Sequence, residues 1–349
     1  MRGRSTCRRN GYTRHMQWFT GRKLHRRIRS VFTDPSFGRP MPIRDPIGRL
    51  ESGNGYALRM VALNGLSFSD LTKVLASIGH GYLPNRSAQM IAFWFGAEPI
   101  AASRAIPYTY KLNGRLVTSY MGCQFMRPYH VRFSRPQVCV HCLDEYGIAM
   151  AVWDISLVTC CPKHGVILID RCAKCKRVLS WRRPDLYTCH CRADLCSMIP
   201  DQATPDAIWL SHHIGCLLFG ESDLPVSESR SRQLLGAFSL DVLLRVVRAL
   251  GVSEGDHVRD IVPGKLTRIL STDEAHGVVY RAFSRVKAIL IGIGAERYAD
   301  CLHLAELRVI GEHVTGIERT MFEHLLDSVA DIDAQCASVK PVKSQLRLF

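Results

Sequence analysis

The chain has 349 residues, of which 47% are hydrophobic and 22% charged, a composition typical of globular domains that excludes a mostly disordered chain. No run of about 18 apolar residues occurs, which excludes a transmembrane helix. The first 30 residues contain no apolar segment of the kind found in secretory signals. We therefore expect a cytoplasmic protein of two or three domains without membrane contact.

The formal net charge of +15 is unevenly distributed along the chain. Residues 1–40 carry +10, residues 41–126 carry +4, residues 127–196 carry +5 and residues 197–349 carry −4. We expect residues 1–40 to form a disordered basic head, either a phosphate-binding arm or an organelle transit peptide. A solvated tail, or residues upstream of a true start at Met41, are the alternatives.

Residues 41–126 begin with the apolar spacing of helices. One helix is predicted from about Gly55 to Gly65, a second from Ser67 to Gly79, and a third after Asn85. This order predicts a helix-turn-helix-like module. A plain helical bundle is the alternative, and the small number of cations in the second and third helices favours it over direct base readout.

Residues 99–136 lack this periodicity, and we expect loops or short strands there. The segment contains four tyrosines that can stack on bases, although we expect them to pack the junction between modules instead: Tyr108, Tyr110, Tyr120 and Tyr129.

Residues 205–330 predict a helical domain, with helices near 207–219, 240–251, 276–291, 296–310 and 317–330. Because residues 197–349 are net negative, this region is a poor DNA-binding face. It is expected to be a scaffold that docks a partner or a second copy of the chain. Residues 334–349 are expected to be a loose tail.

Four pairs of metal-binding residue types lie within 53 residues, between positions 139 and 191. Each pair can form a turn that directs two side chains at one ion, and two turns complete a tetrahedral site. Eight ligands therefore predict a tandem module that binds two zinc ions, over residues 127–196. Pairing in chain order gives a first site of Cys139, Cys142, Cys161 and His164, and a second of Cys172, Cys175, Cys189 and Cys191.

Interleaved pairing of the four turns is the alternative. Several neighbouring residues are out of register with the turns, lie inside them or have no partner at metal spacing. The residues not expected to be ligands are Cys160, Cys196, His141, His190, His212, His213 and His303.

The predicted sites are structural, because protein side chains fill every coordination position, whereas a catalytic zinc keeps one for water. The metalloprotease, deaminase and P-loop motifs are all missing from the sequence. We therefore expect no enzyme, with a zinc-dependent nucleic-acid enzyme as the alternative. Two zinc ions and seven thiolates would lower the module's charge from +5 to +2. That balance favours protein docking over general DNA binding.

The segment from Cys139 to Leu195 resembles the signature of the TniQ/TnsD family, the target-selection proteins of transposons with an AAA+ ATPase regulator. Trp153, the turn from Cys161 to Gly165, and Leu168 match the family pattern. Residues 45–64 resemble its opening helix less closely. The resemblance covers about residues 42–196.

The predicted sites depart from the family pattern at four positions, and three of these lie in the second site. Lys176 and Arg192 stand where the family has glycines, and Val140 and Ala173 replace prolines in two turns. Turn glycines often supply a positive φ. We therefore expect some strain, and a reduced metal affinity, at the second site.

The resemblance implies a non-enzymatic adaptor. Such a protein recognises either target DNA or a CRISPR guide-RNA effector complex and recruits an AAA+ transposition regulator of the TnsC/TniB type. A protein that binds an attachment site directly and sequence-specifically, as in the TnsD branch, is the alternative.

Overall fold

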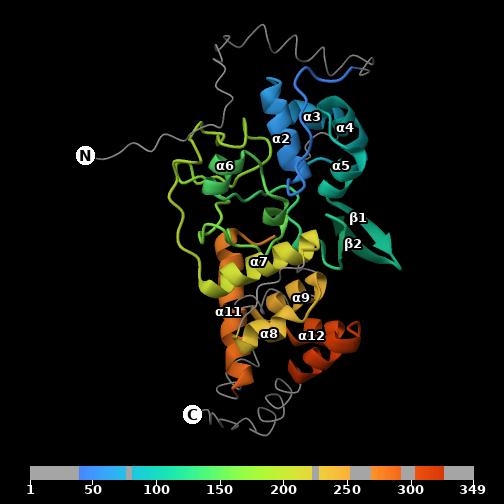
Figure 1. Ribbon diagram of the computed structural model, residues 1–349, viewed down its shortest axis with the longest axis vertical. Coiled ribbons are helices and arrows are strands. Elements are labelled where there is room, and N and C mark those ends of the chain that lie inside the picture. Colours follow the sequence, from blue (N-terminus) through green and yellow to red (C-terminus); the bar gives the residue numbers. More distant parts are fainter. Residues whose placement is uncertain (1–38, 76–80, 222–227, 252–268, 292–302, 326–349) are drawn as a thin grey trace, which may run out of the picture. The chain divides into compact units, whose positions relative to one another are not determined.

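The computed structural model describes residues 39–75, 81–221, 228–251, 269–291 and 303–325. The chain divides into two compact units (Figure 1). The first comprises Met1–Leu224 and Thr267–Ala275, and the second comprises Pro225–Leu266 and His276–Phe349. Helices predominate, with a three-stranded sheet among the described residues, which confirms the predicted mainly α class with small β elements. The predicted head up to residue 38 and the tail at 334–349 lie outside the described residues.

The first unit begins with a group of packed helices. The three helices expected from the periodicity are present, as α2, α3 and α4, and an additional helix, α5, lies in the segment predicted as loops or strands. Glu98 accepts hydrogen bonds from the first backbone amides of α5, and Pro99 occupies its first turn, so the start signals of this helix were present in the sequence. The elements are α2 (Gly53–Leu63), α3 (Phe68–Leu75), η1 (Asn85–Ser87), α4 (Ala88–Phe95) and α5 (Pro99–Ala105).

Helix α2 is buried along most of its length because two glycines let other backbone approach it. A Cβ at Gly53 would lie 2.6 Å from the carbonyl oxygen of Ala105, and a Cβ at Gly55 would lie 2.5 Å from the Cβ of Ala149. Ser52 caps the helix by accepting a hydrogen bond from the amide of Gly55. The amino-terminal end of α2 is therefore packed between α5 and residues 127–196, the predicted zinc module, which we call the metal-binding segment.

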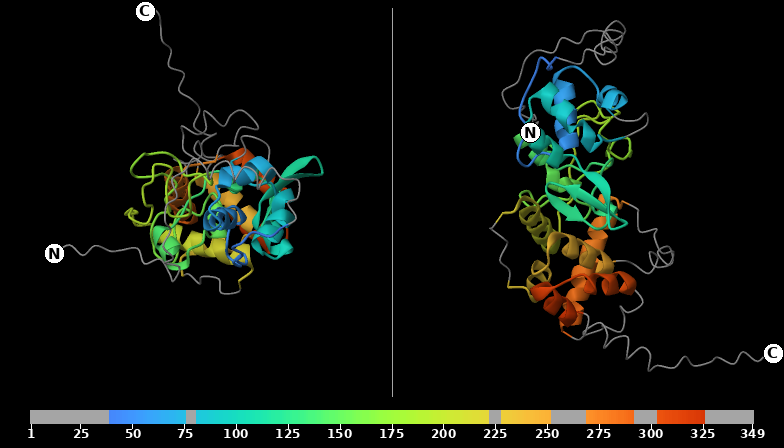
Figure 2. Two further views of the ribbon diagram at one scale, coloured as in Figure 1. Left: turned by 90° about the horizontal axis from the view of Figure 1, so that it is seen from above. Right: turned by 90° about the vertical axis from the view of Figure 1, so that its right-hand side faces the viewer.

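After α5 the chain forms an antiparallel meander of β1 (Tyr108–Leu112), β2 (Arg115–Tyr120) and β3 (Cys123–Phe125). Asn113 and Gly114 join the first two strands at φ values of 50° and 78°, the pattern of a two-residue hairpin turn. The β1–β2 hairpin projects from the rest of the first unit (Figure 2). Tyr120 and Tyr129 are buried, as a packing role requires, whereas Tyr108 is exposed.

The remainder of the first unit contains the short elements η2 (Pro128–His130), α6 (Val140–Tyr146) and η3 (Ala151–Asp154), and the longer helix α7 (Pro205–Phe219). Helix α7 packs on the metal-binding segment: the Ser211 hydroxyl lies 3.3 Å from the Cys160 sulfur, and Ile208 reaches Gly165. The division into units therefore differs from the predicted start of a carboxy-terminal domain at residue 205, because α7 buries its apolar face within the first unit.

The second unit is helical. Arg281 and Arg285 of α11 donate hydrogen bonds to the carbonyl oxygens of Gly251 and Leu250, which satisfies the end of α9. Buried Arg245 of α9 pairs with Glu306 of α12 at 2.8 Å. The elements are α8 (Arg230–Gly236), α9 (Leu240–Gly251), α11 (Thr272–Leu290) from His276 onward, α12 (Leu304–Gly311) and helical residues 316–325. Helix α8 was not predicted, and the predicted helix over 296–310 is described only from residue 303.

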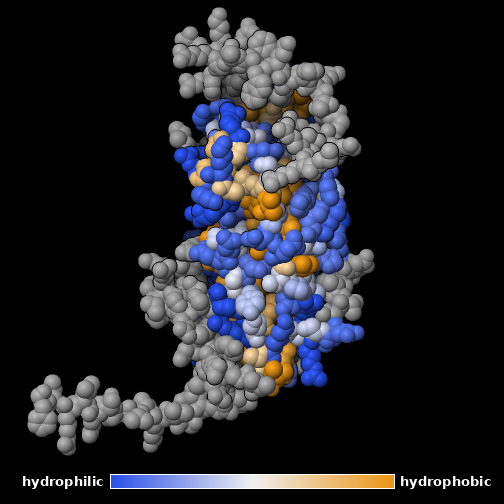
Figure 3. All heavy atoms as spheres, turned by 90° about the vertical axis from the view of Figure 1, so that its left-hand side faces the viewer, coloured by the Kyte–Doolittle hydropathy of each residue, from blue (hydrophilic) through white to orange (hydrophobic). Residues whose placement is uncertain are grey.

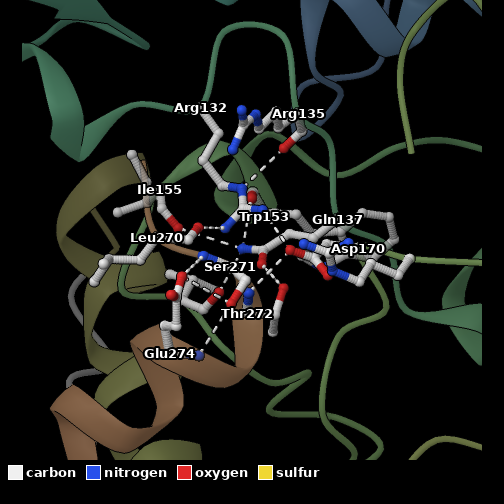
Figure 4. Close-up of polar contacts among 12 residues, drawn as sticks. Arg132, Arg135, Gln137, Trp153, Ile155, Asp170, Leu270, Ser271, Thr272 and Glu274 are labelled. Atoms are coloured by element: carbon white, nitrogen blue, oxygen red, sulfur yellow. Dashed lines mark hydrogen bonds and ion pairs between the residues drawn. The ribbon is translucent and has the colours of Figure 1, made fainter. Parts of the chain in front are cut away.

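A buried polar network fixes residues 269–275, at the start of α11, within the first unit (Figure 4). The Asp170 carboxylate accepts from the Arg132 guanidinium and from the Thr272 amide, both at 3.0 Å. The Thr272 hydroxyl donates to the Gln137 side chain at 2.7 Å, and Arg132 also donates to the carbonyl oxygen of Leu270. Because the four side chains of this network are buried, their hydrogen bonds allow one position of residues 269–275 against the rest of the first unit.

None of the helices in the described part of the chain combines the length and the apolar character needed to cross a membrane.

A second buried network joins the helical group to the metal-binding segment. The Asp154 carboxylate accepts hydrogen bonds from the Ser52 hydroxyl at 2.6 Å and the Tyr120 hydroxyl at 2.8 Å. Burial raises the pKa of Asp154 to about 7, against the opposing effects of Ser52, Tyr120 and Arg132. The folded state therefore holds a proton on Asp154 at pH values where the unfolded chain has released it.

This raised pKa predicts a pH dependence with a definite sign. The contribution of protonated Asp154 to the free energy of unfolding is largest below pH 4. It decreases by about 1.4 kcal/mol for each pH unit as the pH rises from there to about 7. Asp154→Asn keeps a neutral acceptor at every pH and should lack the decrease. Urea unfolding of both proteins between pH 5 and 8 gives the difference curve, and a flat curve would contradict the assignment.

Candidate metal centres

The segment between η3 and α7 contains little regular secondary structure among its described residues. Isolated β-bridges, such as Cys160 with Ile167, connect extended stretches within it, and a bridge between Val138 and Ile169 connects it to the residues before α6. Its buried residues include Trp181, Leu179 and Leu186. Such a segment has few backbone ladders to fix it, so its geometry depends on side-chain interactions.

The structure brings the eight predicted ligands together in two groups of four, in chain order and not interleaved. Within each group all ligand atoms lie within 4.8 Å of one another, which is a separation that one metal ion can span. The first group consists of Cys139, Cys142, Cys161 and His164, and the second consists of Cys172, Cys175, Cys189 and Cys191.

In the first cluster, Nδ1 of His164 lies 3.4 Å from the sulfur atoms of Cys139 and Cys161 and 3.3 Å from that of Cys142. The sulfur atoms of Cys142 and Cys161 are 3.5 Å apart. Ligands at about 2.0–2.3 Å from a tetrahedral ion have separations of this size. The four atoms therefore occupy the corners of a site with a suitable radius.

Two different local structures supply these ligands. Cys139 is the N-cap residue of α6 and Cys142 lies in its first turn, so both side chains leave the same end of the helix. Cys161 begins a tight turn in which its amide donates to the Val166 carbonyl and the Gly165 amide donates back to Cys161. Gly165 has a φ of 66°, a conformation that glycine adopts without steric cost.

The remaining nitrogen of His164 also has a specific partner. Its Nε2 lies 3.0 Å from Oε1 of Glu145, and the other carboxylate oxygen of Glu145 accepts from Lys163. Because the carboxylate is an acceptor, Nε2 holds the proton and Nδ1 presents a lone pair to the sulfur atoms. Metal-binding histidines characteristically have such a carboxylate partner, which the spacing of ligands in the sequence did not identify.

The thiols of the first cluster differ strongly in acidity. Hydrogen bonds from Cys139 and Cys142 lower the pKa of Cys161 to about 2, whereas the hydrogen bonds with Cys139 and Cys161 raise the pKa of Cys142. A bound cation would replace the protons of those thiols.

The second cluster repeats the turn of the first. The amide of Cys172 donates to the Arg177 carbonyl and the Lys176 amide donates back to Cys172, as Cys161, Val166 and Gly165 do. The sulfur atoms of Cys172 and Cys191 are 3.6 Å apart, and those of Cys175 and Cys189 are 3.7 Å apart. Four sulfur donors at these separations suit a tetrahedral ion.

The two turns of the second cluster have side chains in a conformation that favours glycine. Lys176, the counterpart of Gly165, has a φ of 59°, and Arg192 has a φ of 65°. The left-handed region costs a residue with a Cβ roughly 1–2 kcal/mol. The strain expected at the glycine replacements is therefore present in the backbone.

A buried cation lies close to the second cluster. Arg183 is almost fully buried and donates to the carbonyl oxygens of Ser180 and Asp185, while its guanidinium lies over the Trp181 ring. Burial lowers its pKa to about 10, against the attraction of Asp185 and Cys189. Its positive charge offsets the negative charge that four thiolates would bring to this site. No spacing pattern in the sequence indicated this role.

The neighbouring residues excluded as ligands lie outside both clusters. Cys160 contacts Ser211, the His190 ring contacts the Ser180 hydroxyl at 2.9 Å, and the His141 ring stands against the ring of His164. His213 is stacked on Trp209.

The fold and the site together define a helical protein with two clusters, each of which can hold a metal ion. Residues 42–168 match the TniQ family model, so the chain contains a TniQ domain. This domain marks the chain as a transposition-associated protein. The match includes the first cluster and ends before the second. A comparison with curated proteins gives no match.

Glycine at either strained position should relieve the backbone of the second cluster. Lys176→Gly and Arg192→Gly are each expected to raise the free energy of unfolding of the metal-loaded protein by about 1 kcal/mol, because the left-handed conformation no longer opposes a Cβ. Urea unfolding in the presence of excess metal measures the change.

Gly165→Ala is the matched control, because it introduces a Cβ at the equivalent turn of the first cluster, at a φ of 66°. It should lower stability by a similar amount. Destabilisation by both glycine variants would instead mean that contacts of the Lys176 and Arg192 side chains outweigh the strain.

Proposed function

We propose that this chain is a zinc-stabilised, non-enzymatic adaptor that selects a DNA transposition target and recruits an AAA+ transposition regulator of the TnsC/TniB type. The observation that supports it is the TniQ domain over residues 42–168, with a closed four-ligand cluster inside it and a second just beyond. The target is either DNA itself or a CRISPR guide-RNA effector complex bound to DNA.

The donor sets support zinc as the ion. Each cluster offers four donors, three sulfurs and an imidazole or four sulfurs, at separations suited to a tetrahedron. Zinc prefers these soft donors and this geometry in structural sites. When bound, zinc would supply folding free energy to the segment, and Glu145 and Arg183 would orient His164 and balance the thiolate charge.

The same donor sets support a role without catalysis. Protein side chains supply four ligands to each cluster, which leaves no position for an activated water. A zinc-dependent enzyme would need an open coordination position on the metal. Target choice and recruitment therefore fall to surfaces of the protein. Such a surface can also serve a second copy of the chain.

The zinc assignment predicts two equivalents of zinc in the purified protein. Cys142→Ser and Cys175→Ser should each leave one equivalent, because each variant removes a ligand from a different cluster. The affected part should also unfold, since metal binding at structural sites contributes on the order of 10 kcal/mol to folding. Elemental analysis with circular dichroism measures both effects. Fewer than two equivalents in the wild-type protein would contradict the assignment.

The adaptor role predicts that the full chain captures the AAA+ regulator of its own transposon from purified components. It should neither cut DNA nor hydrolyse nucleotide under the same conditions. Cys160→Ser is a suitable control variant, because this buried cysteine lies outside both clusters and contacts Ser211. Turnover that disappears in Cys142→Ser while the remaining fold is intact would overturn the non-enzymatic role.

A further inference from the structure

The charges of the metal-binding segment are separated between its two clusters. Residues 139–170 contain four carboxylates and a single lysine. Residues 171–192 contain seven arginines and lysines against one carboxylate, Asp185. The module's net charge of +5 therefore conceals an acidic stretch of −3, which contains the first cluster, and a strongly basic stretch of +6, which contains the second.

Five cations of the basic stretch are exposed, and each lies within two residues of a ligand of the second cluster. Among the residues that the structure describes, none of the five forms an ion pair. The guanidinium of Arg171 has a long hydrogen bond, 3.5 Å, to the Lys176 carbonyl. We call this set the basic turn surface, and it consists of Arg171, Lys174, Lys176, Arg177 and Arg192.

Convergence of the ligands brings these cations together. The Cys172 and Cys191 sulfur atoms are 3.6 Å apart, and Arg171 and Arg192 are the residues next to them in the chain. The loops of this segment lie at the left of the first unit in Figure 1, and the face seen from that side has hydrophilic regions on both sides of a hydrophobic patch (Figure 3). A local surface of high positive potential results.

The metal centre does not account for this charge. Four thiolates and a divalent ion leave −2, which reduces the charge of residues 171–192 from +6 to +4. Arg183, which is buried beside the cluster, already offsets part of the −2. The five exposed cations therefore remain available to a partner in solution.

Two of these cations occupy strained positions. Lys176 and Arg192 have φ values of 59° and 65°, where glycine would be less strained. Strained residues concentrate at functional sites, so an outlier of this kind indicates where function opposes stability. Both residues with a strained backbone in this cluster have cationic, exposed side chains, which indicates that their charge serves to bind a partner.

The chemistry of the surface favours a polyanion over a protein. None of the large hydrophobic side chains that are exposed in the described residues lies between positions 171 and 192. Protein interfaces usually have buried aromatic or aliphatic anchors. Binding to nucleic-acid backbones depends on lysine and arginine contacts to phosphates.

We propose that the basic turn surface binds the backbone phosphates of duplex DNA. Such contacts position a protein on DNA without reading its sequence. The proposal goes beyond the adaptor role by naming the part of the first unit that faces DNA, and it rests on the proposed metal occupancy of the second cluster.

The test uses the full, zinc-loaded chain and a 30-base-pair duplex of arbitrary sequence, with affinity measured by fluorescence anisotropy at several KCl concentrations. The double variant Lys176→Gly/Arg192→Gly should bind more weakly although its fold is expected to be more stable. The slope of log K against log salt should fall by about 0.9 for each phosphate that the variant no longer neutralises. The triple variant Arg171→Gln/Lys174→Gln/Arg177→Gln removes three cations, so its slope should be about 2.7 smaller in magnitude than that of the wild type.

Lys111→Gln/Arg115→Gln is the matched control, because it removes two exposed cations from the β1–β2 hairpin of the same unit. Its affinity and slope should equal those of the wild type. Equal DNA binding by all variants, with both metal equivalents present, would overturn the proposal. So would a loss of binding to single-stranded RNA in the double and triple variants while duplex binding is unchanged.

Capture of the AAA+ regulator and metal content are measured on the same proteins, and they test the adaptor role separately. Failure of the wild-type chain to capture the regulator would overturn that role alone. Unchanged DNA binding in variants that keep two zinc equivalents and capture the regulator would overturn the basic turn surface alone.

Discussion

Convergence of four side chains on one point is the constraint on which the first unit depends. The chain between η3 and α7 has only isolated bridges and tight turns among its described residues, yet it buries Trp181 and supports α7. The Cys161 and Cys172 turns have the same hydrogen bonds, and their partners come from Cys139–Cys142 and Cys189–Cys191. Convergence of the ligands therefore holds the turns of this segment in place, as inter-strand hydrogen bonds hold the strands of a sheet.

The packing extends this constraint to the rest of the unit. Asp154 joins the cap of α2 to β2, and Asp170 joins Arg132 to the start of α11. Both carboxylates come from the metal-binding segment or its border, and both are buried with specific donors. A displaced segment would leave those donors and acceptors without partners, at a cost of about 1–3 kcal/mol for each group. The convergence of the eight candidate ligands and the packing of the helices are consequently linked.

The sequence was sufficient for features that depend on local spacing. The spacing of the ligand pairs and the helices α2, α3 and α4 follow from residues two to four positions apart, and the structure has these pairs and helices. Other local signals were present and overlooked, namely Asn113-Gly114 for the hairpin and Glu98-Pro99 for α5. The roles of Glu145, Arg183 and Asp170 could not be predicted, because they arise from contacts between turns that only the folded chain brings together. The same holds for α7, whose place in the first unit depends on tertiary packing.

Charge shows most clearly why composition is insufficient here. The expectation that residues after the head bind DNA poorly used net charge summed over whole modules. A phosphate responds to the potential within about 10 Å, the range over which salt screens charges at 0.1 M. The carboxylates Asp144 and Glu145 lie on α6 beside the first cluster, where Glu145 pairs with His164 and Lys163, whereas the five exposed cations lie within two residues of ligands of the second cluster. Because the ligands hold those cations within two residues of one ion, folding concentrates a charge that the sequence distributes over 22 positions. A nearly neutral module can therefore present a surface that attracts DNA.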